Sequence, residues 1–130
     1  MNKNKKNNEK CEKTLSPQQF YIMKERGTEP AFSGKYLNNK EKGIYKCVLC
    51  GNKLFSSKNK FESGSGWPSF DAAINKNSIK ELKDNSYGLR RIEVICSKCS
   101  GHLGHVFNDG PTKTKKRFCI NSCVLDFEKL

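Results

Sequence analysis

The sequence predicts a mainly β domain of the α+β class, with one short helix near its N-terminus. Three observations support this prediction. Several short segments alternate apolar and polar residues and are separated by turn residues, as antiparallel strands are. One stretch carries a clear helix start, at about residue 16. Two Cys-x-x-Cys pairs each follow a predicted strand, which places both pairs in tight turns.

The first 13 residues differ in composition from the rest of the chain. They are rich in Asn, Lys and Glu and contain one cysteine, Cys11. We expect residues 1–13 to be a disordered arm, because they hold too few apolar residues to form a core. Residues 14–130 are then expected to form a single domain, a length that can enclose a hydrophobic core.

No targeting or membrane segment is recognisable. The arm lacks the apolar run of a signal peptide, and no later stretch approaches the about 20 apolar residues of a membrane-spanning helix. We therefore expect a cytoplasmic protein with no membrane partner, in a reducing compartment where paired cysteines bind metal or do chemistry. An organellar address within the arm is the alternative.

The net charge suggests a second function class. A formal charge of +12, from 25 basic and 13 acidic residues, is compatible with a zinc-stabilised module that binds RNA or DNA. The basic residues are spread along the chain, however, and such spreading is typical of a solvated surface. A nucleic-acid module would also give no reason for the Cys, His and Trp motifs described below. We therefore expect no nucleic-acid partner.

Local patterns place the helix and the strands. Ser16 suits the N-cap of a helix over residues 16–26, Pro17 its first position and Gln19 the end of a capping box. Residues 63–70 (SGSGWPSF) combine small residues with a tryptophan and a proline, so we expect an ordered loop there. Alternation predicts strands over residues 43–48, 53–55, 91–96, 102–107, 117–122 and 124–127.

The two Cys-x-x-Cys pairs have the composition of a metal site. Together they supply four thiolates, the usual ligands of structural zinc, and such a closed site leaves no open position for catalysis. The segment between them is much longer than the about 15–20 residues of a compact zinc ribbon, so the metal should connect two distant hairpins. Two separate redox pairs are the alternative. We expect one structural Zn²⁺ per chain, bound by Cys47, Cys50, Cys96 and Cys99.

Cys119 is the candidate nucleophile. In a strand over residues 117–122 the apolar side chains share one face, and Arg117, Cys119 and Asn121 share the other. Positive charge near a thiol favours the thiolate, which is the nucleophilic form. The alternative is a half-exposed cysteine with no chemical role, since free cysteines are usually packing residues.

The only two histidines of the chain, His102 and His105, lie in one predicted strand. In a regular strand they would point to opposite faces. Gly104 between them could allow a bulge or bend that brings both to one side. With the tryptophan loop and the Arg-flanked thiol, they suggest a Cys/His nucleophilic site. Ordinary surface or core positions for the two histidines are the alternative.

Four motifs and the two cysteine pairs together resemble those of methionine-R-sulfoxide reductases, the MsrB family. The motifs are SGSGWPSF at residues 63–70, GHLGHVF at 101–107, DGP at 109–111 and RFCINS at 117–122. They occur in the family's order, and the likeness runs from about residue 16 to residue 127. The resemblance implies two antiparallel β-sheets with flanking helices and a zinc site away from the active site.

The resemblance also implies a reaction. Cys119 would attack the sulfur of methionine R-sulfoxide, free or in an oxidised protein, and become a sulfenic acid as methionine departs. A sulfoxide oxygen is a poor leaving group until it is protonated, so a general acid must stand beside the nucleophile. His105, with His102, matches the family's positions for this task, and an imidazole near neutral pH is suited to it.

Further positions match the family's active site. Arg117 and Asn121 match catalytic positions, and Arg117 would help to hold the thiolate. Trp67 matches the aromatic residue that packs against the substrate's methyl group, and Phe107 and Asp109 match other substrate-binding positions. For these last three residues, core packing and turn formation are the alternatives.

One departure from the family concerns how the sulfenic acid is reduced. Many members carry a recycling cysteine two residues before the loop tryptophan, where this chain has Ser65. Cys11 on the arm and Cys123 are candidate resolving cysteines, although a straight strand would hold Cys123 about 13 Å from Cys119. The third route is direct reduction by an external thiol reductant such as thioredoxin. We expect a monomer, and a zinc-bound redox sensor whose metal-site cysteines oxidise first is a further alternative.

Overall fold

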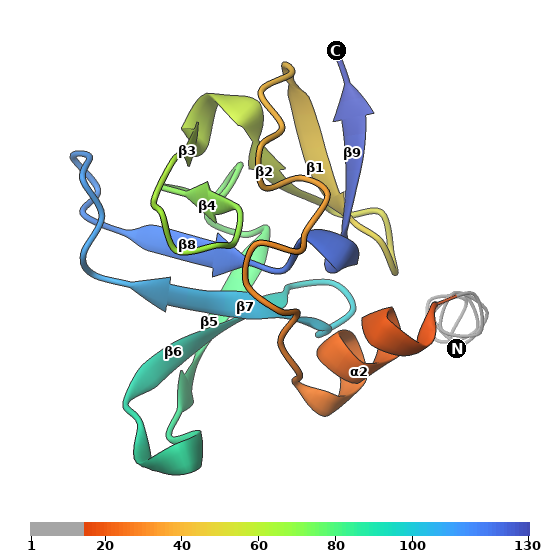
Figure 1. The fold of residues 1–130 in the computed structure, drawn as a ribbon, viewed down its shortest axis with the longest axis vertical. Coiled ribbons are helices and arrows are strands. Elements are labelled where there is room, and N and C mark those ends of the chain that lie inside the picture. The colour runs from red at the N-terminus through yellow and green to blue at the C-terminus, as the bar shows by residue number, and fades with distance from the viewer. Residues whose placement is uncertain (1–14) are drawn as a thin grey trace.

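The computed structural model describes residues 15–130, coloured in Figure 1. The predicted arm and Cys11 lie outside the described residues. Within residues 15–130 the chain forms two antiparallel sheets, one α-helix and three short 3-10 helices. The predicted mainly β fold with one short N-terminal helix is therefore confirmed, as are the two sheets that the family resemblance implied.

The helix α2 spans Pro17–Glu25. Its start has the predicted capping box, in which the Ser16 hydroxyl accepts from the backbone of Gln19 and the Gln19 side chain accepts from the backbone of Ser16. Ile22 and Met23 are buried and hold the helix against the larger sheet. The helix ends at Arg26, which has a left-handed backbone with φ of 60°.

The smaller sheet has three strands in the order β2-β1-β9. They are β1 (Gly43–Cys47), β2 (Lys53–Ser56) and β9 (Leu125–Lys129). The sheet therefore joins a hairpin from the first half of the chain to its last strand. Figure 1 shows it above the larger sheet, with the C-terminus at its upper end.

The larger sheet has six strands in the order β3-β4-β8-β7-β6-β5. They are β3 (Lys60–Phe61), β4 (Ser69–Phe70), β8 (Arg117–Ile120), β7 (His102–Phe107), β6 (Arg91–Cys96) and β5 (Ile79–Asp84). The 3-10 helices η1 (Ser57–Asn59), η2 (Ser86–Gly88) and η3 (Ser122–Val124) lie between strands. Because β7 and β8 are central, residues on their exposed face have neighbours on both sides.

Several predicted strand boundaries were wrong by one or two residues, and two of these errors concern the site. The segment 63–70 is a loop only as far as Pro68, because Ser69 and Phe70 form β4 and pair with β8. The strand predicted over residues 117–122 ends at Ile120, and the chain then turns into η3. Both errors have one cause: pairing with a distant strand, which periodicity does not show, decides where a short strand begins and ends.

The core lies between the two sheets and is rich in aromatic residues. Phe55 of β2 stacks on Phe70 of β4 with ring centroids 4.4 Å apart. Tyr45 of β1 meets Phe70 edge-on at 5.2 Å. All three side chains are fully buried. The short strand β4, and with it the tryptophan loop, is therefore fixed by packing against the smaller sheet.

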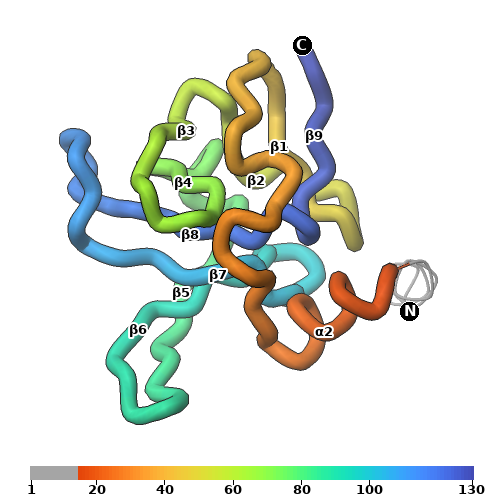
Figure 2. Tube along the Cα trace, viewed as in Figure 1, coloured from red at the N-terminus to blue at the C-terminus, as the bar shows by residue number. Residues whose placement is uncertain are grey.

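The connector from α2 to β1, residues 27–42, crosses in front of the larger sheet (Figure 2). The backbone N–H of Phe32 donates to the carbonyl of Gly66 at 2.7 Å, and that of Glu29 donates to the Asn121 side chain at 3.0 Å. The connector thus lies against both the tryptophan loop and the end of β8, and it forms one wall of the site described next.

Candidate active site

Cys119 occupies the middle of the larger sheet. On β8 it pairs with Ser69 of β4 on one side and with His105 of β7 on the other. Directly opposed residues of antiparallel strands point to the same face. Strand register alone therefore places the predicted nucleophile and one predicted proton donor side by side.

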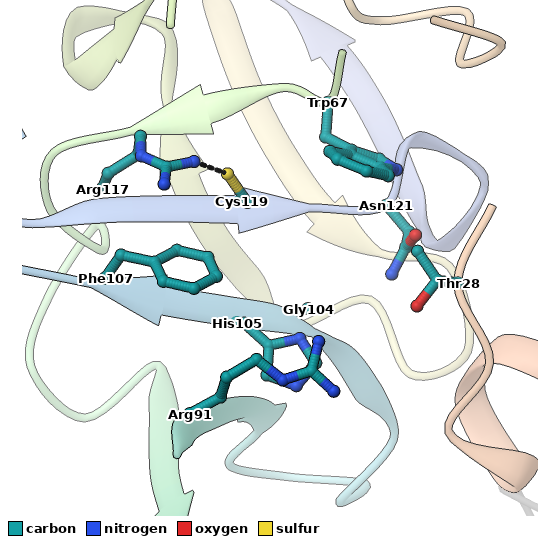
Figure 3. A pocket seen from close by; sticks show the side chains of 9 residues that line it. All are labelled: Thr28, Trp67, Arg91, Gly104, His105, Phe107, Arg117, Cys119 and Asn121. Atoms are coloured by element: carbon teal, nitrogen blue, oxygen red, sulfur yellow. Dashed lines mark hydrogen bonds between the residues drawn. The ribbon is translucent and has the colours of Figure 1, made fainter. Parts of the chain in front are cut away.

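A pocket of about 220 Å³ opens over this face (Figure 3). Six of the residues that line it were predicted from the sequence: Trp67, His105, Phe107, Arg117, Cys119 and Asn121. The others are Thr28, Arg91 and Gly104. The pocket thus gathers a thiol, an imidazole, two guanidinium groups and two aromatic rings, and these come from four parts of the chain.

Arg117 is held so that one of its N–H groups donates a hydrogen bond to the sulfur of Cys119. Its Nη1 donates to Cys119 Sγ at 2.7 Å, and its Nε and Nη2 donate to the two carboxylate oxygens of Asp109 at 2.8 and 2.9 Å. The guanidinium also lies over the Phe107 ring, 4.5 Å from its centroid. The pKa of Arg117 is raised, mainly by Asp109. Asp109 itself is exposed and stands outside the pocket, so it contacts the site only through Arg117.

A chain of serine hydroxyls borders the sulfur on its other side. Ser65 Oγ lies 3.6 Å and Ser69 Oγ lies 3.8 Å from Cys119 Sγ. Ser63 Oγ is 2.7 Å from each of these hydroxyls and connects them. Ser65, the position at which the family resemblance implied a recycling cysteine, therefore faces the predicted nucleophile directly.

The two histidines share one side of β7, as the sequence suggested they could. The pairing of β6 with β7 sets Glu93 opposite His105 and Ile95 opposite His102, so the register shifts within the strand. This irregularity brings the two imidazole rings together, with centroids 5.4 Å apart and an edge-on arrangement. His105 lines the pocket, whereas His102 is fully buried behind it.

Each histidine has its own carboxylate partner. His105 Nε2 lies 2.7 Å from Asp84 Oδ2, and His102 Nδ1 lies 2.7 Å from Glu93 Oε2. The pKa of Asp84 is lowered well below its usual range by hydrogen bonds from Ser86 and from His105. The pKa of His102 is lowered by burial, which outweighs the attraction of Glu93. His105 lines the pocket, whereas Asp84, Glu93 and His102 are not part of its lining.

Trp67 and Asn121 are fixed by the connector. Trp67 Nε1 donates to the carbonyl of Glu29 at 3.0 Å. The Asn121 amide donates to the carbonyl of Leu103 at 2.9 Å and accepts from the backbone N–H of Glu29 at 3.0 Å. The polar atoms of both side chains therefore form hydrogen bonds with backbone groups. These bonds fix the positions of the two side chains in the wall of the pocket.

Within residues 15–130, the one candidate resolving cysteine is Cys123, and it does not line the pocket. Cys123 lies in η3, packs against the hydrophobic core and is absent from the pocket lining. Its backbone N–H donates to Glu29 Oε1 at 3.1 Å. Burial, and then the nearby Glu29 carboxylate, raise the pKa of its thiol to about 12. Cys11 lies outside the described residues.

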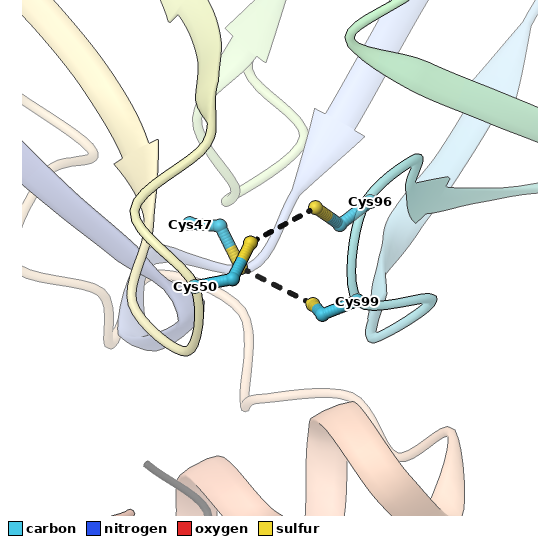
Figure 4. Close-up of side chains that lie close together, drawn as sticks. All are labelled: Cys47, Cys50, Cys96 and Cys99. Carbon is cyan, nitrogen blue, oxygen red and sulfur yellow. Dashed lines mark hydrogen bonds between the residues drawn. The ribbon is translucent and has the colours of Figure 1, made fainter. Parts of the chain in front are cut away.

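The four paired cysteines come together, as Figure 4 shows, and none of them lines the pocket. Their sulfur atoms all lie within 4.8 Å of one another, and the Cys47–Cys99 and Cys50–Cys96 distances are 3.6 and 3.5 Å. Four sulfurs at the usual zinc–sulfur distance would be about 3.8 Å apart in a tetrahedron. The geometry therefore suits a metal ion, and the set joins the end of β1 to the end of β6.

The two cysteine turns have the same backbone pattern. The N–H of Gly51 donates to the carbonyl of Cys47 at 2.8 Å, and the N–H of Ser100 donates to that of Cys96 at 2.9 Å. Gly51 and Ser100 are both left-handed, with φ of 80° and 63°. The turn that follows each pair is thus the same tight structure, and it points two sulfurs toward the other hairpin.

Several residues of the site carried no signal in the sequence. Ser65 and Ser69 belong to the loop that was singled out, but their contact with Cys119 depends on strand pairing. Asp84, Glu93 and Arg91 are ordinary charged residues of strands or strand ends, and nothing in their local pattern separates them from other charges. Glu29 is fully buried, which a position before a proline does not reveal.

Comparisons with known proteins find similar sequences over most of the chain. A family model described as SelR domain matches residues 15–129. The peptide methionine sulfoxide reductase MsrB of Methanosarcina mazei is 52% identical over 128 residues, which are 98% of this chain and 91% of that protein. The protein of the same name from Leptospira interrogans is 52% identical over 124 residues, 95% of either chain. The mouse protein named methionine-R-sulfoxide reductase B3, mitochondrial, is 53% identical over 115 residues, 88% of this chain and 46% of that protein.

None of the helices in residues 15–130 has the length and apolar character needed to cross a membrane. The cytoplasmic location stays a prediction.

Proposed function

Because the chain belongs to the SelR domain family and is a methionine-R-sulfoxide reductase, we propose that Cys119 is its nucleophile and methionine R-sulfoxide, in oxidised proteins or free, its substrate. One observation carries the proposal. The Cys119 sulfur lies in a pocket with a guanidinium N–H 2.7 Å away and with His105 as its cross-strand partner. The attack needs the thiolate, and the Arg117 guanidinium is placed to donate a charged hydrogen bond to it.

The proposed reaction transfers one oxygen atom. The Cys119 thiolate attacks the sulfoxide sulfur while the sulfoxide oxygen takes up a proton. The oxygen then passes to Cys119, which becomes a sulfenic acid, and the thioether of methionine leaves. The substrate sulfur is reduced by two electrons and the cysteine sulfur is oxidised by two. His105 is the proton donor, since it is the histidine that lines the pocket.

The remaining pocket residues receive supporting roles. Trp67 packs against the substrate's methyl group, and its indole is held by Glu29. Phe107 forms an apolar wall and also supports the Arg117 guanidinium. Asn121 fixes the connector to β8, and Asp109 acts through its two hydrogen bonds to Arg117. His102 stands behind His105 and supports it.

We propose direct reduction of the sulfenic acid by an external thiol, such as thioredoxin. Two thiols of the reductant would return Cys119 to its thiol and become a disulfide, and one water molecule would leave. Ser65 occupies the position of the usual recycling cysteine, and Cys123 is partly buried with a pKa near 12. The expected protein is a monomer that repairs oxidised proteins in the cytoplasm.

We propose that the four paired cysteines hold one structural Zn²⁺. The four sulfurs form a closed set at zinc-like spacing, and Asn52 donates an amide N–H to Cys96 Sγ at 3.6 Å. The set connects the smaller sheet to the larger one, so a metal there would stabilise the whole domain. Bound zinc would supply structure and no catalytic step.

The test is turnover of the two methionine sulfoxide epimers with dithiothreitol, for the wild type and for Cys119→Ser. The proposal expects the wild type to consume only the R epimer and the variant to consume neither. A folded, metal-bound wild type that reduces neither epimer would contradict it and would favour a basic zinc-stabilised binding module. Cys123→Ser is the matched control, since it removes a thiol outside the pocket and should retain activity.

A further inference from the structure

Arg26, at the end of α2, bridges the two carboxylates that hold the histidines. Its Nη2 lies 3.2 Å from Asp84 Oδ1 and 3.1 Å from Glu93 Oε1. Both carboxylates are almost fully buried, whereas the Arg26 side chain is half exposed. Each carboxylate thus uses one oxygen for Arg26 and the other for a histidine. Asp84 Oδ1 also accepts from Ser86, and Asp84 Oδ2 lies 3.5 Å from Arg91 Nη2.

These contacts determine which nitrogen of each histidine carries the proton. An ionised carboxylate can only accept hydrogen bonds. His105 must therefore donate from Nε2 to Asp84, and His102 must donate from Nδ1 to Glu93. The nitrogen of His105 left to exchange a proton with a substrate is then Nδ1. The Nε2 of His102 is buried and has no hydrogen-bond partner within residues 15–130.

The backbone of Arg26 indicates that its side chain is needed there. Arg26 is left-handed, with φ of 60° and ψ of 36°, and its N–H donates to the carbonyl of Tyr21. Glycine is the usual residue in this conformation, which costs other residues about 1 kcal/mol. An arginine at this position sacrifices some helix-end stability but reaches both carboxylates.

The same four side chains do not form a second metal site. Two histidines and two carboxylates are a ligand set that many metals accept. Here, however, the Arg26 guanidinium stands between the carboxylates, and each histidine is already hydrogen-bonded to one of them. Within the described chain, the paired cysteines are the set whose ligand atoms come close enough to share an ion.

We propose that Arg26 is a positioning residue for the reductase reaction. By bridging Asp84 and Glu93, it fixes His105 with Nε2–H hydrogen-bonded to Asp84. When the ring is protonated at both nitrogens, Nδ1 delivers its proton to the sulfoxide oxygen, and the neutral Nε2–H ring remains. This inference rests on the proposed role of His105 as the proton donor. Arg26 does not line the pocket, so it should act on the chemical step and not on substrate binding.

The first experiment removes the bridge without straining the backbone. Arg26→Gly deletes the guanidinium and places the favoured residue in a left-handed position, so the backbone is not strained. Loss of the ion pairs to two buried carboxylates should lower the stability, so kcat is measured at a temperature where circular dichroism shows the variant to be folded. A general acid contributes about 10²- to 10⁴-fold, and we expect loss of its positioning to lower kcat about 10- to 100-fold. KM for the R-sulfoxide should stay within about twofold. Arg26→Lys, which keeps the charge but loses the planar fork, should retain part of the activity.

Lys115→Gly is the matched control. Lys115 is also a basic, left-handed residue, with φ of 58°, but it lies in the turn between β7 and β8, away from the histidines. Its replacement should leave kcat and KM unchanged. If Arg26→Gly has the kcat of the wild type, or loses activity only through a higher KM, the inference is wrong.

A second measurement does not depend on activity. Nitrogen-15 NMR of the histidine rings, at a pH where both rings are neutral, should show the Nε2–H form for His105 and the Nδ1–H form for His102. Asp84→Asn should weaken the preference of His105 for the Nε2–H tautomer. The Nδ1–H tautomer of His102 should stay dominant. An Nδ1–H form of His105 in the wild type would overturn the inference. Failure of the wild type to reduce either sulfoxide would instead contradict the proposed function.

Discussion

His105 of β7 and Cys119 of β8 are direct cross-strand partners, and their side chains project from the same face of the larger sheet. The neighbouring pair, Gly104 with Ile120, keeps this register. A Cβ atom on Gly104 would collide with the carbonyl of Cys119. The absence of a side chain at Gly104 therefore lets β7 approach β8 closely enough to form the site.

Gly104→Ala should damage both stability and activity. The added methyl group would meet backbone rather than a movable side chain, so β7 and β8 must separate. We expect the free energy of unfolding to fall by about 2 kcal/mol or more, and activity to fall even at temperatures where the protein is folded. Urea unfolding and a single-turnover assay check this. Gly88→Asn is the control. Gly88 is left-handed and has open space around it, and asparagine tolerates that backbone conformation. Equal losses of stability and activity in the two variants would show that close packing at Gly104 is unimportant.

Ser65→Cys should create an internal recycling route. Ser65 Oγ is 3.6 Å from Cys119 Sγ, so a thiol at this position needs only a small movement to attack the sulfenic acid. After one turnover without reductant, the variant should contain a 65–119 disulfide, visible as a loss of two thiols and of two hydrogen masses. Ser65→Ala should form no such bond. If the disulfide is absent although the sulfoxide has been consumed, the loop holds position 65 differently from the structure described above.

Cys11 and Cys123 should both be dispensable for recycling by thioredoxin. Cys123 is packed beside Glu29 outside the pocket, and Ser65 already fills the space next to Cys119. The double variant Cys11→Ser, Cys123→Ser should therefore turn over R-sulfoxide with thioredoxin at the wild-type rate. Steady-state kinetics with thioredoxin, its reductase and NADPH give the answer. A large loss confined to the thioredoxin assay, with activity in dithiothreitol intact, would identify one of these cysteines as a resolving residue.

The sequence was sufficient to predict what depends on local patterns. Strand alternation identified most of the sheet, and Ser16, Pro17 and Gln19 located the helix start correctly. The two Cys-x-x-Cys turns could be paired because sulfur ligands are needed in fours. Gly104 between two histidines correctly suggested an irregular strand, because glycine marks such positions.

What the sequence could not show depends on contacts between distant segments. The carboxylates behind the histidines come from β5 and β6, and the arginine between them comes from the end of α2. Each is a common charged residue whose partner is set by the fold. Cys123 illustrates the same limit, since counting alternate residues assumed a strand that in fact ends at Ile120.

Cys123 should make stability depend on alkaline pH. Its thiol has a pKa of about 12 in the folded protein, against about 8.5 for a free thiol. Above pH 8.5 the unfolded chain loses this proton while the folded chain keeps it, so the free energy of unfolding falls as the pH rises toward 12. Urea unfolding of the wild type and Cys123→Ser at pH 7.5 and pH 10 isolates the effect, because the other titrating groups are common to both. The wild type should lose more stability than the variant; an equal loss would mean that the thiol is not held in its neutral form.

Removal of the metal should unfold the domain rather than disable an intact site. The four sulfurs join β1 of one sheet to β6 of the other, and the pocket lies elsewhere on the larger sheet. Cys99→Ser should therefore lower zinc content from one per chain to nearly none and cost about 4 kcal/mol or more. In the wild type treated with a strong chelator, activity and the near-ultraviolet circular dichroism signal should disappear together. Cys119→Ser, which removes a thiol of the pocket, should keep its zinc and its stability. If chelation abolishes activity while the circular dichroism signal persists, the metal takes part in the reaction and its purely structural role is wrong.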